Sequence, residues 1–201
     1  GRALDEEVAE AAVRPPRPIR LGRPRFAAEE FGLTPAQKGT ALHLVMQYID
    51  FERTERVEQV RAEIARLVER AFLTPQQGEA VDPAKIAAFF ASPLGRELMA
   101  STSLRREFKF SILTDAGEYV RGAEGEQVML QGVVDCFWLE PDGIVLVDFK
   151  TDKTPYGPEE RAAHYAPQLR AYAKALSRMY GLPVKEKILY FFSCDCAYRL
   201  E

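Results

Sequence analysis

The spacing of apolar residues changes about halfway along the chain, from a helical period to a strand period. Up to about residue 102, apolar residues recur every three or four positions, as they do along one face of a helix. Several segments in this half start with a capping side chain followed by proline, which favours the first helical position. They are Thr34-Pro35, Thr74-Pro75, Asp82-Pro83 and Ser92-Pro93. We therefore predict helices over about residues 35–51, 56–72, 75–80, 83–91 and 93–100.

From about residue 103, apolar and polar residues alternate in short runs, which is the pattern of strands. We predict strands over about residues 104–113, 128–139, 144–150, 187–192 and 197–200. Pro141-Asp-Gly143 is a turn sequence, so the second and third strands should form a tight antiparallel hairpin. One helix, over about residues 159–179, interrupts the strands and ends at Gly181. We expect its sheet-facing residues to be Ala163, Leu169, Tyr172, Ala173 and Leu176.

These elements indicate an α/β (α+β) fold, in which a sheet and its helix follow an N-terminal helical half. We expect one domain over residues 32–201, helical over about 32–102 and with its sheet core over about 103–201. Residues 1–31 differ, because Arg14-Pro-Pro-Arg-Pro18 cannot form a regular helix or a central strand. We predict a linker or an arm there. Its arginines leave a DNA-contacting arm open as the alternative.

Composition narrows the function only a little. With 201 residues, 47% hydrophobic residues and a net charge of −3, the chain has the character of a globular protein with no overall attraction to nucleic acid. No apolar run approaches the roughly 20 residues that span a bilayer, and no signal peptide is visible, so we expect no membrane partner and a cytoplasmic location. The chain begins at Gly1, as a piece of a longer protein would.

The number and spacing of the cysteines, and the lack of a phosphate-binding loop, argue against several kinds of site. Cys136, Cys194 and Cys196 are too few and too irregularly spaced for a disulfide framework, a structural zinc site or a four-cysteine iron–sulfur cluster. A redox pair at Cys194 and Cys196 is the less favoured alternative. The chain also lacks the glycine-rich phosphate loop that precedes Lys-Ser/Thr in nucleotide-driven motors, so we expect no bound nucleotide.

The candidate chemistry lies in two neighbouring strands. Asp148 and Lys150 are two positions apart on one strand and therefore point to the same face. If the hairpin is tight, Asp135 on the preceding strand lies beside them. Carboxylate and carbonyl oxygens are the ligands that Mg²⁺ and Mn²⁺ prefer, and an ammonium group beside them could assist hydrolysis of a phosphodiester. The competing interpretation is a buried Asp–Lys ion pair that serves only structure.

His43 adds a candidate ligand from the first helix. Gly39, one turn earlier on the same face, removes side-chain bulk beside it. A single helix histidine is more often an ordinary core or surface residue than a ligand, so the pattern alone leaves both roles open. We expect the other histidine, His164, to lie on a helix surface.

Taken in order, these motifs resemble RecB-type nucleases of the PD-(D/E)XK superfamily. The motifs, spread from Gly39 to Tyr172, are Gly39-Thr-Ala-Leu-His43, Arg106-Glu107, Gly132-Val-Val-Asp135, Asp148-Phe-Lys150-Thr151 and Gln168-Leu-Arg-Ala-Tyr172. The closing Leu189-Tyr-Phe-Phe192 is similar to the last strand of nuclease domains of the AddA type, which end helicase–nuclease subunits. The resemblance implies a restriction-endonuclease-like core with a mixed central sheet flanked by helices.

The resemblance also implies roles for individual residues. His43, Asp135 and Asp148 would be side-chain metal ligands, the Phe149 carbonyl a backbone ligand, and Lys150 the catalytic lysine. Gln168 and Tyr172 would face the site in a supporting role, and Glu107 matches a family acidic position.

The implied function is an Mg²⁺-dependent DNA exonuclease, with Mn²⁺ possible. It would act in double-strand-break repair and recombination, on single strands delivered by a helicase in the same longer chain and beside a partner subunit. A non-catalytic DNA-binding or subunit-docking module of the same fold is the alternative.

Overall fold

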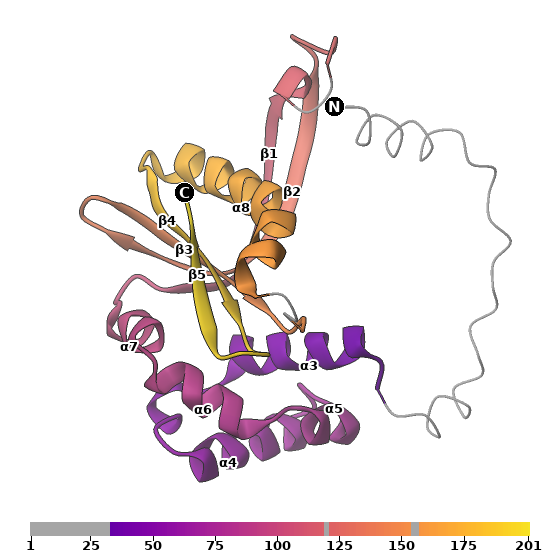
Figure 1. Cartoon of the computed structure of the whole chain (residues 1–201), viewed down its shortest axis with the longest axis vertical. Coiled ribbons are helices and arrows are strands. Elements are labelled where there is room, and N and C mark those ends of the chain that lie inside the picture. Colours follow the sequence, from indigo (N-terminus) through magenta and orange to yellow (C-terminus); the bar gives the residue numbers. More distant parts are fainter. Residues whose placement is uncertain (1–32, 119–120, 154–156) are drawn as a thin grey trace, which may run out of the picture. The chain divides into compact units, whose positions relative to one another are not determined.

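A five-stranded mixed sheet, in the order β1-β2-β3-β4-β5, organises the protein (Figure 1). The computed structural model describes residues 33–118, 121–153 and 157–201, and the predicted arm over residues 1–31 lies outside them. Only β3 and β4 are parallel, and the other neighbours are antiparallel. The strands are β1 (Arg105–Asp115), β2 (Gln127–Glu140), β3 (Gly143–Lys150), β4 (Val184–Phe191) and β5 (Cys196–Leu200).

The helices lie where the capping pattern predicts them. Thr34, Thr74 and Ser92 each accept a hydrogen bond from a backbone N–H of the first turn, and Asp82 does the same. Short 3-10 turns lie at Phe51–Arg53 and Ala116–Glu118. The helices are α3 (Pro35–Tyr48), α4 (Val57–Glu69), α5 (Pro75–Ala80), α6 (Pro83–Ala91), α7 (Pro93–Ala100) and α8 (Pro158–Tyr180). The predicted hairpin between β2 and β3 and the mixed sheet are confirmed.

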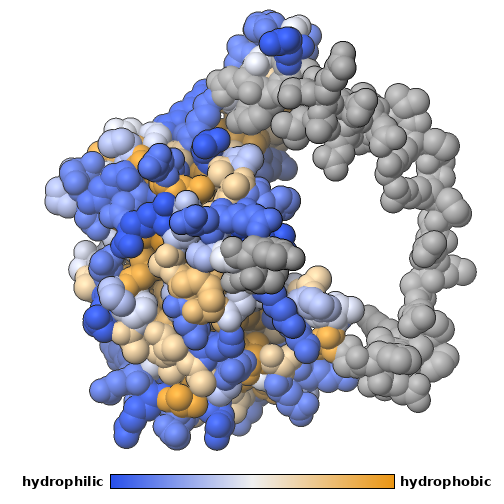
Figure 2. Space-filling model, in the orientation of Figure 1, coloured by the Kyte–Doolittle hydropathy of each residue, from blue (hydrophilic) through white to orange (hydrophobic). Residues whose placement is uncertain are grey.

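Each face of the sheet has its own apolar core, which is why β3 is buried on both sides. On one face, Phe149 packs edge-on against Phe89 of the helical half, at 5.2 Å between ring centroids. On the other face, Leu169 and Leu176 of α8 pack over the sheet. Figure 2 shows hydrophilic side chains over the tip of the β1–β2 hairpin and more apolar surface over the helices below the sheet. None of the helices in the described residues is both long and apolar enough to cross a membrane.

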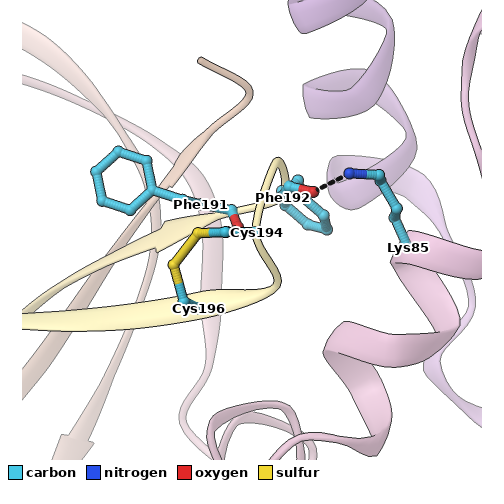
Figure 3. Close-up of a disulfide and its surroundings, with 5 residues drawn as sticks. All are labelled: Lys85, Phe191, Phe192, Cys194 and Cys196. Atoms are coloured by element: carbon cyan, nitrogen blue, oxygen red, sulfur yellow. Dashed lines mark hydrogen bonds between the residues drawn. A yellow bond between two sulfur atoms is a disulfide. The ribbon is translucent and has the colours of Figure 1, made fainter. Parts of the chain in front are cut away.

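Two sequence predictions are wrong in detail. Ala163 is exposed, and Ala162 and Ala166 are buried in its place. One residue turns a helix by about 100°, so Ala162, Ala166 and Leu169 form the buried stripe and Ala163 falls beside it. In addition, Cys194 and Cys196 form a disulfide in the turn between β4 and β5 (Figure 3), whereas the sequence favoured no disulfide framework and left a pair here only as the less favoured alternative. The turn brings their Cα atoms to 5.3 Å, within the range that a disulfide spans.

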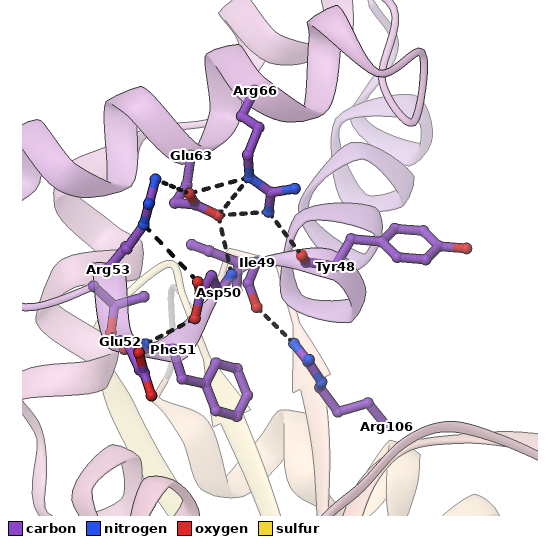
Figure 4. A network of polar contacts seen from close by, with 10 residues as sticks. Tyr48, Ile49, Asp50, Phe51, Glu52, Arg53, Glu63, Arg66 and Arg106 are labelled. Atoms are coloured by element: carbon purple, nitrogen blue, oxygen red, sulfur yellow. Dashed lines mark hydrogen bonds and ion pairs between the residues drawn. The ribbon is translucent and has the colours of Figure 1, made fainter.

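A buried carboxylate fixes the end of the helix that carries the candidate histidine (Figure 4). Glu63, which is 1% exposed, accepts hydrogen bonds from the Asp50 backbone and from Arg66. Arg66 also donates to the Tyr48 carbonyl at the last residue of α3. Arg106 of β1 donates to the Met46 and Ile49 carbonyls. These contacts satisfy carbonyls that the helix end would otherwise leave unpaired, and they attach α3 to α4 and to the sheet.

Candidate functional site

The β2–β3 hairpin brings the two aspartates together. Its register pairs Cys136 with Val147, and continuing that register by one residue sets Asp135 opposite Asp148. The Phe149 backbone N–H donates to Asp135 Oδ2 at 2.7 Å. Asp148 is only 3% exposed, so the hairpin carries a carboxylate into the interior. Phe149 itself points into the opposite core, as the alternation predicts.

Lys150 lies on the same side of the strand as Asp148. Its Nζ is 2.6 Å from Asp148 Oδ2, which is a close ion pair. Oδ2 nevertheless has no hydrogen-bond partner of acceptable geometry among the described residues, although it is buried. Lys150 Nζ donates instead to Gln168 Oε1 at 3.2 Å, and Gln168 Nε2 donates to Tyr172 Oη at 2.8 Å. The structure therefore places Gln168 and Tyr172 of α8 at the site, where two successive hydrogen bonds connect Tyr172 through Gln168 to Lys150.

His43 and Glu107 reach the same place from α3 and β1. His43 Nδ1 lies 3.1 Å from Asp135 Oδ1. Glu107 has a φ of 48°, which is left-handed and unusual in a strand, and it lies where the β1–β2 register skips a pair. His43, Glu107 and Asp135 each offer a ligand atom, and these atoms all lie within 4.8 Å of one another. The structure thus places Glu107 among the possible metal ligands, whereas the sequence indicated it only as an acidic position of the family. Asp148 lies outside this group of three.

Burial and mutual repulsion set the protonation of this cluster. Burial, followed by the charge of Asp135, raises the pKa of Asp148 to about 6, although Lys150 and His43 oppose the shift. Burial and the charge of Asp135 also raise the pKa of Glu107. For His43, burial lowers the pKa, but the hydrogen bond and charge of Asp135 outweigh it and the net pKa is raised. The two carboxyl shifts therefore reflect burial first and the neighbouring negative charge of Asp135 second.

The donor set fits a hard divalent cation. Two carboxylates and an imidazole lie within one ion's reach, and a third carboxylate beside them keeps a buried oxygen without a hydrogen bond. Carboxylate oxygens suit Mg²⁺ and Mn²⁺, and the imidazole suits Mn²⁺ better than Mg²⁺. A cation here would also offset the burial and the repulsion from Asp135 that raise the pKa values of Asp148 and Glu107.

Sequence reasoning missed Tyr165 and Asp152. The Tyr165 ring lies under the lysine ammonium, with 4.1 Å from Lys150 Nζ to the ring centroid. Tyr165 Oη donates to Asp152 Oδ2, and burial together with this bond raises the pKa of Tyr165 to about 12. A signal was available, because Tyr165 precedes Gln168 by three residues and so lies on the same helix face. His164 is exposed, as predicted.

Two glycines of the motifs allow the elements to approach closely. A Cβ on Gly39 would lie 3.0 Å from Thr151 Oγ1, so this glycine lets α3 contact the end of β3. A Cβ on Gly132 would lie 2.7 Å from the rings of Phe110 and Tyr172. Both glycines therefore serve packing around the site, which agrees with the reduced bulk expected at Gly39.

Comparisons with known proteins agree with this geometry. Residues 18–197 match the PD-(D/E)XK nuclease superfamily. Several proteins named as ATP-dependent helicase/nuclease subunits of the AddA type are similar in sequence. That of Acetivibrio thermocellus is 44% identical over 199 residues, which is 95% of this chain and 16% of the relative. The relative from Pelotomaculum thermopropionicum is 47% identical over 187 residues, which is 91% of this chain and 15% of the relative.

The relative from Geobacillus kaustophilus is 42% identical over 183 residues, which is 86% of this chain and 15% of the relative. The chain thus spans about 16% of the length of such relatives. The alignment with a solved structure entitled "Crystal structure of SSO0001" covers 98% of this chain and 73% of that chain, at 15% identity and a TM-score of 0.39. Because the family match extends over most of its length, the chain belongs to the PD-(D/E)XK nuclease superfamily, and its sequence is homologous to part of the AddA-type ATP-dependent helicase/nucleases.

Proposed function

We propose that this chain is a divalent-metal-dependent deoxyribonuclease, with Mg²⁺ as its metal and Mn²⁺ as a substitute. The observation that carries the proposal is the convergence of His43, Glu107 and Asp135 beside the buried Asp148–Lys150 pair. An ion pair that served only structure would not need a histidine and two further acidic side chains from separate elements. The family match supports the same chemistry.

In this proposal His43, Asp135, Asp148 and the Phe149 carbonyl hold the metal, and Glu107 contributes to the same site. When bound, the metal supplies charge neutralisation at the phosphate and a more acidic water. Lys150 donates hydrogen bonds to the phosphate oxygens or the attacking water as negative charge develops. Gln168, Tyr172 and the Tyr165 ring hold the lysine in position, which limits the orientations that its ammonium group samples.

We further propose that the substrate is single-stranded DNA and that cleavage is exonucleolytic. The strand would arrive from a helicase portion of a longer chain, next to a partner subunit, during cytoplasmic repair and recombination of broken DNA. The similar proteins are named as ATP-dependent helicase/nucleases, which supports this context.

A cleavage assay tests the proposal. The chain should degrade end-labelled single-stranded DNA with Mg²⁺ and not with EDTA, and Lys150→Ala should reduce the rate at least about 100-fold, the usual scale for such a group. Arg61→Ala, at an exposed position of α4, is the control and should keep the wild-type rate. Full activity of Lys150→Ala would refute the assignment. Binding of DNA without cleavage by the wild type would favour a docking or DNA-binding module.

A further inference from the structure

A basic pocket lies at the end of β3, the strand that carries Asp148 and Lys150, and the proposed chemistry does not use it. It has a volume of about 330 Å³, which exceeds a phosphate group with several waters, and it is formed by α3, α6 and the ends of β3 and β4. Three lysines line it, namely Lys38, Lys85 and Lys153. Asp82 also lines it, but its Oδ1 caps α6 by accepting from the Ala84 N–H. The net charge of the lining is therefore positive.

The polar groups of this pocket retain unused hydrogen-bonding capacity. Lys38 and Lys153 are exposed, and the ammonium group of neither has an ion-pair or hydrogen-bond partner within the described part of the chain. Lys85 reaches from α6 to donate to the Phe192 carbonyl at 2.5 Å, as Figure 3 shows, which holds its ammonium at the wall with further N–H donors free. Ser193 Oγ is buried without a hydrogen-bond partner among the described residues. Such a set is suited to an anion.

The pocket is joined to the candidate site by two short steps along the chain. Thr151 lines the pocket and directly follows Lys150, and Leu42 lines it and directly precedes His43. Consecutive Cα atoms are about 3.8 Å apart, so both walls lie one residue along the chain from the site, although the pocket opens on the side of the sheet that carries Phe149. A DNA strand carries one negative charge per nucleotide, so a strand whose phosphate is at the site must place neighbouring phosphates within reach of such a surface.

We propose that this pocket binds a backbone phosphate next to the scissile one, and so fixes the path of the DNA strand along the end of β3. Lys38, Lys85 and Lys153 contact the phosphate, and the apolar wall formed by Leu42, Val81 and Phe192 contacts the sugar or base. This inference rests on the proposed function, because it takes the strand from the candidate site. The pocket adds affinity and position, and it takes no part in breaking the bond.

The test is the salt dependence of DNA binding, measured without cleavage. Fluorescein-labelled oligodeoxythymidylate is titrated with the full 201-residue chain in EDTA at several salt concentrations. Each phosphate contact contributes about −0.7 to the slope of log K against log[salt] for a single strand. Because the three lysines would share one phosphate, the Lys38→Ala/Lys153→Ala double variant should make the slope less steep by up to about 0.7, which is roughly a threefold difference in salt sensitivity between 50 and 200 mM.

Arg61→Ala/Arg70→Ala is the matched control, because it removes the same charge from exposed positions on and at the end of α4 that do not line the pocket. It should leave the slope unchanged. The proposal is overturned if the pocket double variant keeps the wild-type slope, or if the control double variant changes it equally. All four replaced side chains are exposed, so folding should not need them, and unchanged thermal melting of each variant checks this. Failure of the proposed function is a separate result, since it would appear as no Mg²⁺-dependent cleavage by the wild type.

Discussion

Neutralising one buried carboxylate should make the metal-free protein more stable, and it should abolish most of the stabilisation that a bound metal ion gives. Asp148 is 3% exposed, and its pKa is raised to about 6 by burial and by Asp135. At neutral pH the folded chain therefore holds an ionised carboxylate that is less stable than the same group in the unfolded chain. Asp148→Asn keeps the shape of this side chain and removes that charge, at the cost of one proposed metal ligand.

The magnitude follows from the difference between folded and unfolded pKa values. An aspartate in an unfolded chain has a pKa of about 3.9, and each unit is worth about 1.36 kcal/mol, so ionised Asp148 costs the fold about 3 kcal/mol at pH 8. Because the folded pKa is the higher one, the stability is present at low pH and is lost as pH rises from about 4 to 6. For a chain of this length, about 3 kcal/mol corresponds to roughly 6–12 °C in Tm.

The assay is thermal melting in EDTA and in Mn²⁺. At pH 8 in EDTA, Asp148→Asn should melt above the wild type, and the gap should narrow as pH falls towards 4. Mn²⁺ should raise the Tm of the wild type much more than that of the variant, since only an ion that binds the folded state stabilises it. Asp142→Asn is the control: Asp142 is exposed and pairs with Lys185, which lowers the pKa of Asp142, so its neutralisation should not stabilise. An Asp148→Asn variant that melts at or below the wild type in EDTA would refute the reasoning.

Two further predictions concern residues that support the site. Tyr165→Phe should keep most of the cleavage rate, whereas Tyr165→Leu should lower it severalfold, because only the second removes the ring under the Lys150 ammonium; equal rates in the two variants would contradict this. Glu63→Gln should lower the free energy of unfolding in urea by about 2 kcal/mol, less than a fully buried pair loses, because Arg66 keeps access to water. A change below about 0.5 kcal/mol would show that this network does not hold the end of α3.

Short-range chemistry explains why so much of the fold could be predicted. Caps such as Thr34 and Ser92 act on N–H groups within three residues, so the starts of their helices are visible in the sequence. The alternation of β3 likewise placed Asp148 and Lys150 on one face and Phe149 on the other. The end of α3 is different. It is held by Arg66 and by Arg106, which lie about 20 and 60 positions further along the chain, and the prediction ran on to about residue 51.

The site was predictable where family motifs or alternation applied, and not where the backbone departs from regular structure. Glu107 shows the limit, because its left-handed φ turns the side chain in a way that strand alternation does not describe. Tyr165 could have been found by extending the face of Gln168 and Tyr172 back by one turn. The pairing of Cys194 with Cys196 depends on the turn geometry between β4 and β5, which the spacing alone did not reveal.

The most direct test of the account is the position of a bound metal. Crystals of the chain soaked in Mn²⁺ should show one anomalous peak in the site, within about 2.5 Å of His43, Asp135 and Asp148 ligand atoms and of the Phe149 carbonyl. Such a peak would establish that the acidic cluster is a metal site. A crystal with no peak there, or with manganese only at exposed carboxylates elsewhere, would contradict the central claim.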